Sequence, residues 1–85
     1  MNYTVEYGRA AAQQLERLDR QVQERIRDAV AALGANPRPV GVRKLSGPEE
    51  LYRIREGDWR IVYQIRDRAL RVLVVRIGHR RDVYR

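Results

Sequence analysis

Hydrophobic and polar residues alternate along three stretches of the chain, a pattern typical of β-strands that bury one face. The alternation is found in residues 2–7, 51–56 and 59–66. Successive side chains of a strand point to opposite faces, so a period of two predicts three half-buried strands. A fourth stretch, 70–77, is apolar at nearly every position. We expect it to form a central strand that is covered on both sides.

Two stretches between the first and second of these strands have the period of an α-helix. Apolar residues in 11–18 lie on one face of a short helix, and those in 22–33 form a longer stripe. Asp19 can cap the second helix, and Gly34 and Pro37 are expected to end it. Two apolar stripes need a common surface, so we expect a helical hairpin packed on one face of the sheet. The expected core contains Leu15, Leu18, Val22, Ile26, Ile54, Ile61 and Tyr63.

The second and third strands are separated by Gly57 and Asp58, which favour a two-residue hairpin loop. An even register keeps the apolar residues of both strands on one face, whereas an odd register sets arginine against isoleucine. The even register also brings Arg53, Arg55 and Arg60 into one patch, although like charges opposite each other are destabilising. A bound anion would offset that repulsion. The predicted pairs are Arg55 with Arg60, Ile54 with Ile61 and Tyr52 with Tyr63.

The composition limits the class of protein. The chain has 85 residues, which allows a single domain spanning residues 1–85. Hydrophobic residues make up 44% of the chain, enough to fold a small core. No apolar run is long enough to span a bilayer and the chain starts on strand-like sequence instead of a signal peptide, so we expect a cytoplasmic protein without membrane contact. Cysteine is absent, which excludes disulfides and thiolate metal sites.

The net charge of the chain restricts the kinds of partner that it can bind. The net charge of +7 at pH 7 suggests a nucleic acid or an acidic protein as the partner. Most of the excess lies after residue 41. Arginine binds phosphate well but is a poor proton acceptor, and Lys44 is the only lysine. Glu49 and Glu50 point apart as chain neighbours and have no histidine beside them, so neither a metal site nor another cofactor is expected.

The C-terminal stretch, 78–85, holds the remaining candidate chemistry. Arg80 and Arg81 form a second basic cluster, which favours phosphate binding over a merely solvated basic surface. His79 is the only histidine, and it is either a structural residue at the end of a strand or an acid–base catalyst. Tyr84 lies among arginines, where no periodic pattern of apolar residues predicts a buried aromatic side chain. Base stacking, proton transfer and simple packing all remain open for it.

Residues 51–55 (LYRIR), 57–63 (GDWRIVY) and 78–84 (GHRRDVY) carry a resemblance to a known family, and residues 15–18 (LERL) and 36–37 (NP) agree with it. Together these segments resemble the RelE branch of the RelE/ParE toxin superfamily. The resemblance implies a RelE-like α+β fold of order β-α-α-β-β-β with an antiparallel sheet. It also implies a metal-independent endoribonuclease that cleaves messenger RNA in the ribosomal A site. An acidic RelB-like antitoxin would neutralise it, and operator DNA would be contacted only through that antitoxin.

The resemblance also assigns roles to single residues. Arg53 and Arg55 stand at the positions of basic strand residues near the scissile phosphate, where the best-known members have lysines. Arg60 matches a phosphate-binding arginine, Arg80 a catalytic arginine and Tyr84 the C-terminal tyrosine. The expected catalytic residues are Arg55, Arg60, His79, Arg80 and Tyr84, and the expected RNA contacts are Lys44, Arg53, Arg55 and Arg81.

Two other functions stay open. A ParE-like toxin would have the same fold and inhibit DNA gyrase without RNA chemistry, although Tyr84 behind Arg80 argues against it. A plain nucleic-acid-binding domain would need stacking aromatics on its basic face, where we expect few. Cleavage without a metal is chemically reasonable, because Arg60 and Arg80 can stabilise the charge that develops on the phosphate. His79 or Tyr84 could then move the protons.

Overall fold

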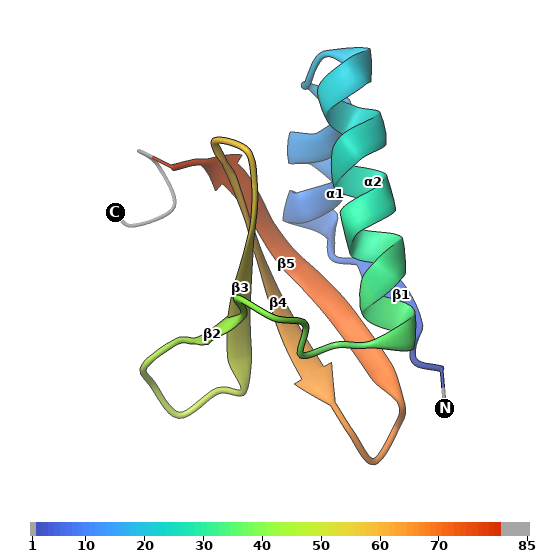
Figure 1. Ribbon diagram of the computed structural model, residues 1–85, viewed down its shortest axis with the longest axis vertical. Helices are drawn as coiled ribbons and strands as arrows, with labels where there is room; N and C mark the ends of the chain where they lie inside the picture. The colour runs from blue at the N-terminus through green and yellow to red at the C-terminus, as the bar shows by residue number, and fades with distance from the viewer. Residues whose placement is uncertain (1, 81–85) are drawn as a thin grey trace.

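A strand, two helices and four further strands follow one another in the computed structural model, which describes residues 2–80 (Figure 1). The elements are β1 (Thr4–Tyr7), α1 (Arg9–Glu16), α2 (Arg20–Ala35), β2 (Arg43–Lys44), β3 (Leu51–Glu56), β4 (Trp59–Arg66) and β5 (Arg71–His79). The expected α+β class is confirmed, as are both helices and the four expected strands. Within the described residues no helix is long and apolar enough to cross a membrane.

The five strands form one sheet in the order β1-β5-β4-β3-β2. The strands β3, β4 and β5 pair antiparallel as expected, but β1 pairs with β5 in parallel, so the sheet is mixed and not wholly antiparallel. A parallel neighbour needs a long connection, and here both helices and the rest of the sheet lie between the two strands. The sequence did not predict the short β2. The surrounding segment contains two prolines and a glycine, which argue against strand pairing.

The β3–β4 hairpin has the predicted register. Gly57 has a φ of 59°, the left-handed conformation that a two-residue turn of this kind requires and that glycine adopts without strain. The pairs Arg55–Arg60, Ile54–Ile61 and Tyr52–Tyr63 are all present. The apolar residues of these pairs therefore lie on one face and the two arginines on the other.

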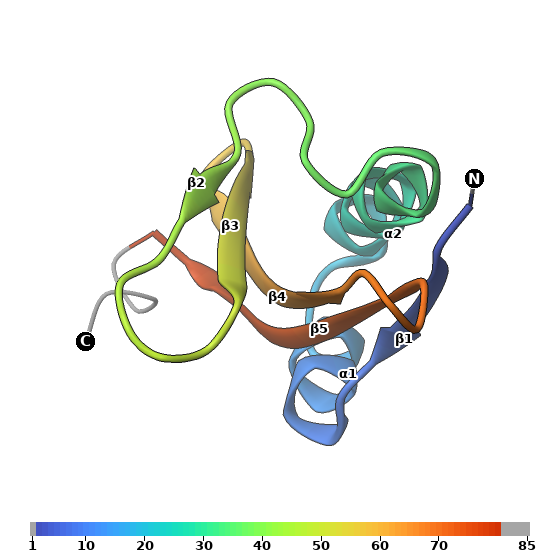
Figure 2. The same cartoon turned by 90° about the horizontal axis from the view of Figure 1, so that it is seen from below.

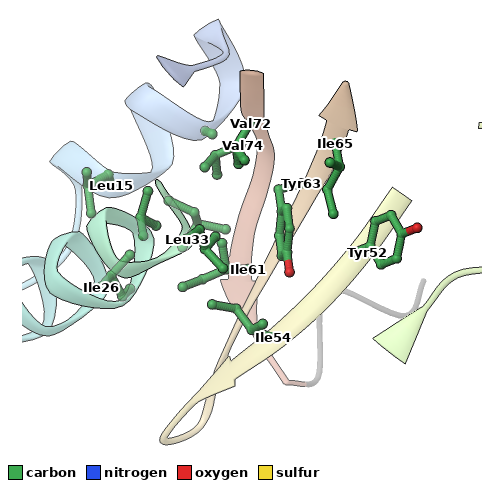
Figure 3. Packing of buried hydrophobic residues seen from close by; sticks show 13 residues of the cluster. Leu15, Ile26, Leu33, Tyr52, Ile54, Ile61, Tyr63, Ile65, Val72 and Val74 are labelled. Carbon is green, nitrogen blue, oxygen red and sulfur yellow. The ribbon is translucent and has the colours of Figure 1, made fainter. Parts of the chain in front are cut away.

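Both helices contribute to one hydrophobic cluster with that apolar face (Figure 3). Five of the seven expected core residues are buried, whereas Leu18 and Val22 are only half-buried. Leu18 falls in the turn after α1, which ends at Glu16, and Val22 lies in the first turns of α2. The buried cluster consists of Ala11, Leu15, Ile26, Val30, Leu33, Tyr52, Ile54, Ile61, Tyr63, Ile65, Val72, Val74 and Ile77.

The helices do not cover both faces of β5, contrary to the expectation for an all-apolar strand. Leu73 and Val75, on the face away from the cluster, are half-buried. The helix α1 lies along β5 beyond the end of β1, where the Gln14 side-chain oxygen accepts a hydrogen bond from the Ile77 backbone N–H at 2.7 Å. This bond satisfies a backbone donor at an edge that β1 does not reach.

The helix α2 runs one residue past Gly34, which the sequence predicted as its end. A Cβ atom at Gly34 would lie 3.1 Å from the Tyr3 carbonyl oxygen, and the Gly34 oxygen accepts a hydrogen bond from the Tyr3 N–H at 2.7 Å. The glycine therefore permits close packing of α2 against the first strand and does not end the helix.

A polar cluster links the loop after α2 to Tyr3, which precedes β1, and to Asp67, which follows β4. Arg38 donates to both carboxylate oxygens of Asp67, at 3.1 and 2.9 Å, and the Tyr3 hydroxyl donates to Asp67 at 2.6 Å. The Arg38 guanidinium also lies over the Tyr52 ring, 5.2 Å from its centroid. The hydrogen bonds from Arg38 and then from Tyr3 lower the pKa of Asp67 to about 2.

The buried cluster predicts unequal effects for two truncations. Ile61→Ala removes a fully buried side chain and should lower the free energy of unfolding by roughly 2–5 kcal/mol. Leu18→Ala should cost clearly less, because Leu18 is half-buried. Urea denaturation followed by circular dichroism measures both. Equal losses at the two sites would show that the core extends to the α1–α2 turn.

The polar cluster predicts how stability depends on acid pH. The Asp67 carboxylate is held in its charged form, so its contribution to stability is complete above its unfolded pKa of about 4 and is lost as the pH falls through about 2. Asp67→Asn should therefore be less stable than the wild type at neutral pH, and the difference should shrink on acidification. Thermal melts between pH 7 and pH 2 test this. A constant difference across that range would contradict it.

Candidate functional site

The face of the sheet away from the hydrophobic cluster carries two rows of residues that the strand pairing places side by side. In the first row Arg43 of β2 lies opposite Arg53 of β3, Arg53 opposite Val62 of β4, and Val62 opposite Arg76 of β5. Residues opposite each other in a sheet project on the same side. Three arginines from three strands are thus aligned across the sheet.

The second row lies one pleat nearer to the hairpin turn. Arg55 of β3 lies opposite Arg60 of β4, and Arg60 lies opposite Gly78 of β5. We call the five arginines of the two rows the arginine face. They are Arg43, Arg53, Arg55, Arg60 and Arg76.

Arg60 is the central residue of the arginine face. It is the one charged side chain in residues 2–80 that is buried, with 8% of its surface exposed. Its Nη1 donates to the carbonyl oxygens of Gly57 and Trp59 at 3.3 and 3.2 Å, while its Nε is buried and has no hydrogen-bond partner in the described chain. Buried cations are normally paired, so a buried guanidinium that forms no ion pair within residues 2–80 is a candidate anion-binding group.

The arginines of this face repel one another. Burial lowers the pKa of Arg53, and the positive charges of Arg43, Arg60 and Arg55 lower it further. Folding therefore brings these charges together against their mutual repulsion. A phosphate group placed between them would relieve it through charge-assisted hydrogen bonds.

The predicted site residues are divided between the two faces of the sheet. Arg53, Arg55 and Arg60 come together as expected. The Arg80 backbone N–H donates to the Asp58 carbonyl at 2.8 Å, which holds this residue beside the hairpin turn next to the arginine face. Arg81 and Tyr84 lie outside the described residues.

Two of the predicted residues are not brought to the arginine face. His79 pairs with Trp59 across the β4–β5 ladder, and the two rings meet edge to face with centroids 5.6 Å apart. Both lie on the side of the hydrophobic cluster. Lys44 pairs with Tyr52 on that same side and forms an ion pair with Glu50 at 3.4 Å.

The sequence interpretation missed Arg43 and Arg76. Arg43 joins the site only because β2 pairs with β3, and that pairing has no signal in a segment containing two prolines and a glycine. Arg76 was visible as a charge within the apolar stretch of β5. A register shift next to Val62 leaves Val75 unpaired and sets Arg76 opposite Val62, which local alternation does not predict. Among residues 2–80 there is no group of three acidic, histidine or cysteine side chains that could hold a metal ion.

The chain matches a family profile and curated relatives over most of its length. A profile described as the ParE toxin of the type II toxin–antitoxin system parDE matches residues 5–84. An Escherichia coli protein described as a RelE-like toxin is 32% identical over 88 residues, covering 99% of this chain and 92% of the relative. The toxin RelG of Mycobacterium tuberculosis is also 32% identical, over 89 residues that cover 100% of this chain and 99% of RelG.

Solved structures share the fold. The archaeal RelE–RelB complex from Pyrococcus horikoshii matches with a TM-score of 0.84 and 25% identity, covering 98% of this chain and 100% of that chain. The isolated E. coli RelE toxin matches with a TM-score of 0.78 and 25% identity, covering 91% and 83%. The toxin–antitoxin complex RelBE2 from M. tuberculosis has a TM-score of 0.84 over 96% and 95% of the two chains, and at 24% identity it supports the fold alone.

The crowded arginine face predicts that anions stabilise the protein. Pyrophosphate should raise the melting temperature more than sodium chloride does at equal ionic strength, because it binds the folded state at this face. Arg55→Gln should reduce that gain without lowering the melting temperature in chloride, since it removes one of the mutually repelling charges. Arg68→Gln, in the exposed β4–β5 turn, is the matched control and should keep the full gain. An equal gain in all three proteins would show that the anion binds elsewhere.

Proposed function

The chain belongs to the ParE toxin family of type II toxin–antitoxin systems, within the RelE branch of the RelE/ParE superfamily, and from this premise we propose that it is a metal-independent endoribonuclease of messenger RNA. The observation that carries the proposal is the arginine face, with the buried Arg60 at its centre, which forms no ion pair with the described part of the chain. Such a surface suits a substrate that presents phosphates in a row. Cleavage of messenger RNA would inhibit translation in the cytoplasm.

The reaction proceeds by attack of a 2′-hydroxyl on the adjacent phosphorus, with loss of the 5′-oxygen of the next nucleotide. Negative charge develops on the phosphate oxygens in the transition state. Arg60 and Arg55, opposite each other across the ladder, can donate to these oxygens from fixed positions, and Arg80 can approach from the end of β5. Arg53 contributes to holding the phosphate.

Proton transfer is harder for this chain to catalyse than stabilisation of the charge on the phosphate. Arginines stay charged and make poor bases, and Lys44 lies on the other side of the sheet beside Glu50. We assign proton transfer to Tyr84, in agreement with the C-terminal tyrosine of the family pattern. His79, packed on Trp59, holds the strand end that carries Arg80 and acts as a positioning residue. Bound in the ribosomal A site, the RNA would already be oriented, and positioning alone can contribute about 7–11 kcal/mol.

The proposal includes a protein partner. Several solved structures that share this fold are complexes of a RelE toxin with a RelB antitoxin. We propose that an acidic RelB-like antitoxin neutralises this chain, because the net charge of +7 favours fast association with an acidic protein. Any contact with operator DNA would then be made through the antitoxin.

A second candidate function rests on the family profile, which carries the name of ParE. In that case the chain would inhibit DNA gyrase by binding and would not cleave RNA. The arginine face would then contact the enzyme or its DNA. Toeprinting of a translated messenger and a gyrase supercoiling assay with the same purified protein separate the two candidates.

The nuclease proposal predicts the effect of three substitutions. Arg60→Ala, Arg80→Ala and Tyr84→Phe should each reduce single-turnover cleavage on the ribosome by about 10²-fold or more, as the loss of a charge-stabilising or proton-transferring group does. Circular dichroism and antitoxin pull-down should show that the proteins still fold. Full toxicity in all three variants would eliminate the nuclease and leave gyrase as the target.

His79 provides the internal comparison. His79→Gln should keep the shape of the pH–rate profile and lose only part of the rate, because the side chain lies away from the arginine face. A catalytic histidine would instead contribute a protonation step to the wild-type pH–rate profile. Loss of that step in His79→Gln would show that His79 is a catalytic residue.

A further inference from the structure

A hollow of about 300 Å³ lies on the same side of the sheet as the arginine face. It is lined by Leu45, Leu51, Val62, Val75 and Arg76. Leu45 belongs to the loop between β2 and β3, which lies on the side of the sheet away from α2 in Figure 2. Four of the five lining side chains are apolar, so an apolar surface interrupts a basic one. We call it the apolar hollow.

The register shift between β4 and β5 creates this hollow. In a regular ladder Val75 and Arg76 would point to opposite faces. Here Val75 has no partner in β4, and both residues reach the side of the sheet on which Val62 lies. A bulge of this kind changes the direction of a side chain and is common beside active sites. Val62 is only 5% exposed and forms the floor of the hollow.

Cations flank this floor on two sides. Arg53 of β3 and Arg76 of β5 are the neighbours of Val62 across the sheet. Arg76 is exposed and forms no ion pair within residues 2–80. Arg55 follows two residues after Arg53 on β3, a rise of about 6.6 Å along the strand. A ligand with a flat apolar part and more than one phosphate would therefore meet matching groups along this surface.

We propose that the apolar hollow binds the base of a nucleotide beside the cleavage point of the RNA. The base packs on Val62 and Val75, while Arg53 and Arg76 bind the phosphate attached to that nucleotide. The flat faces of a base pack on apolar surfaces, and an arginine guanidinium stacks on them. This inference rests on the proposed function, because it adds a second nucleotide to the site around Arg60. The bound base would fix which phosphate lies at Arg60.

A nucleotide matches this surface better than other occupants do. A phosphate ion would match Arg53 and Arg76 but would leave the apolar lining exposed to water. An apolar side chain of a protein partner would fill the hollow but would leave the two cations without an anion. A nucleotide presents an apolar face and a phosphate a short distance apart, as single-strand sites with stacking surfaces and basic grooves require.

Adenosine monophosphate and ribose 5-phosphate differ only by the base and provide the direct test. Adenosine monophosphate should bind at least about fivefold more tightly, as expected for one stacked base. In nuclear magnetic resonance titrations it should shift the methyl signals of Leu51, Val62 and Val75, whereas ribose 5-phosphate should shift arginine Nε–H signals alone. Equal affinities without methyl shifts would overturn the inference and would favour an apolar side chain of a protein partner as the occupant.

Leu51 and Leu73 provide a matched pair of variants. Both are half-buried and lie in one row across the sheet, on either side of Gln64, but only Leu51 lines the hollow. Leu51→Thr should reduce the advantage of adenosine monophosphate over ribose 5-phosphate to less than about twofold, because it removes apolar contact with the base. Leu73→Thr should keep the full advantage. Threonine suits strands, and the ratio of the two dissociation constants is independent of the fraction of protein that is folded. Equal ratios in the two variants would show that the base binds elsewhere.

These measurements need neither the ribosome nor cleavage, so this inference and the nuclease proposal can fail separately. If the wild type cleaves messenger RNA but binds the two ligands alike, the hollow is not a base site and the nuclease stands. If the base adds affinity but no RNA is cleaved, the hollow stands and the nuclease fails.

A last measurement connects the hollow to the reaction. An abasic nucleotide at one of the two positions beside the cleavage point should raise KM for cleavage by the wild type by about fivefold, with little change in kcat. Leu51→Thr should show less than about half of that rise, whereas Leu73→Thr should show all of it. A KM that is unchanged at both positions would contradict the placement of the base in the hollow.

Discussion

The two-residue turn at Gly57 and Asp58 is the constraint on which both faces of the sheet depend. It sets an even register, so Ile54 and Ile61 face the helices while Arg55 and Arg60 face away from them. A slip of one residue would move the apolar set to the outside and bury guanidinium groups against α2. The core and the candidate site are therefore two results of one pairing, and neither can shift without the other.

The helices complete this division by covering only one face. The cluster of apolar residues beneath them provides the stability that permits five arginines to gather on the opposite face. Burial and then the neighbouring positive charges lower the pKa of Arg53, and the mutual repulsion is a cost that a phosphate can offset on binding. The same cations reach the edge of β3, where Arg43 and Arg55 also line an apolar groove.

Local patterns in the sequence predicted those features that depend on neighbouring residues. The period of two and the glycine turn gave the register of β3 and β4, and the period of 3.6 gave both helices. Pairing between distant segments had no local signal. The parallel partner of β5, the short β2 with Arg43, and the register shift that sets Arg76 opposite Val62 emerge only when the sheet assembles. For the same reason the motif around His79 did not show that its ring packs on Trp59.

The central claim is that the arginine face binds RNA phosphates for cleavage. Nuclear magnetic resonance can follow the arginine Nε–H signals during titration with an RNA blocked by a 2′-O-methyl group at the scissile nucleotide, which removes the attacking hydroxyl. We predict that this RNA remains intact and that the signals of Arg53, Arg55 and Arg60 shift together, with the largest change at the buried Arg60. Shifts confined to arginines of the helices, such as Arg20 and Arg27, or cleavage of the blocked RNA, would contradict the account.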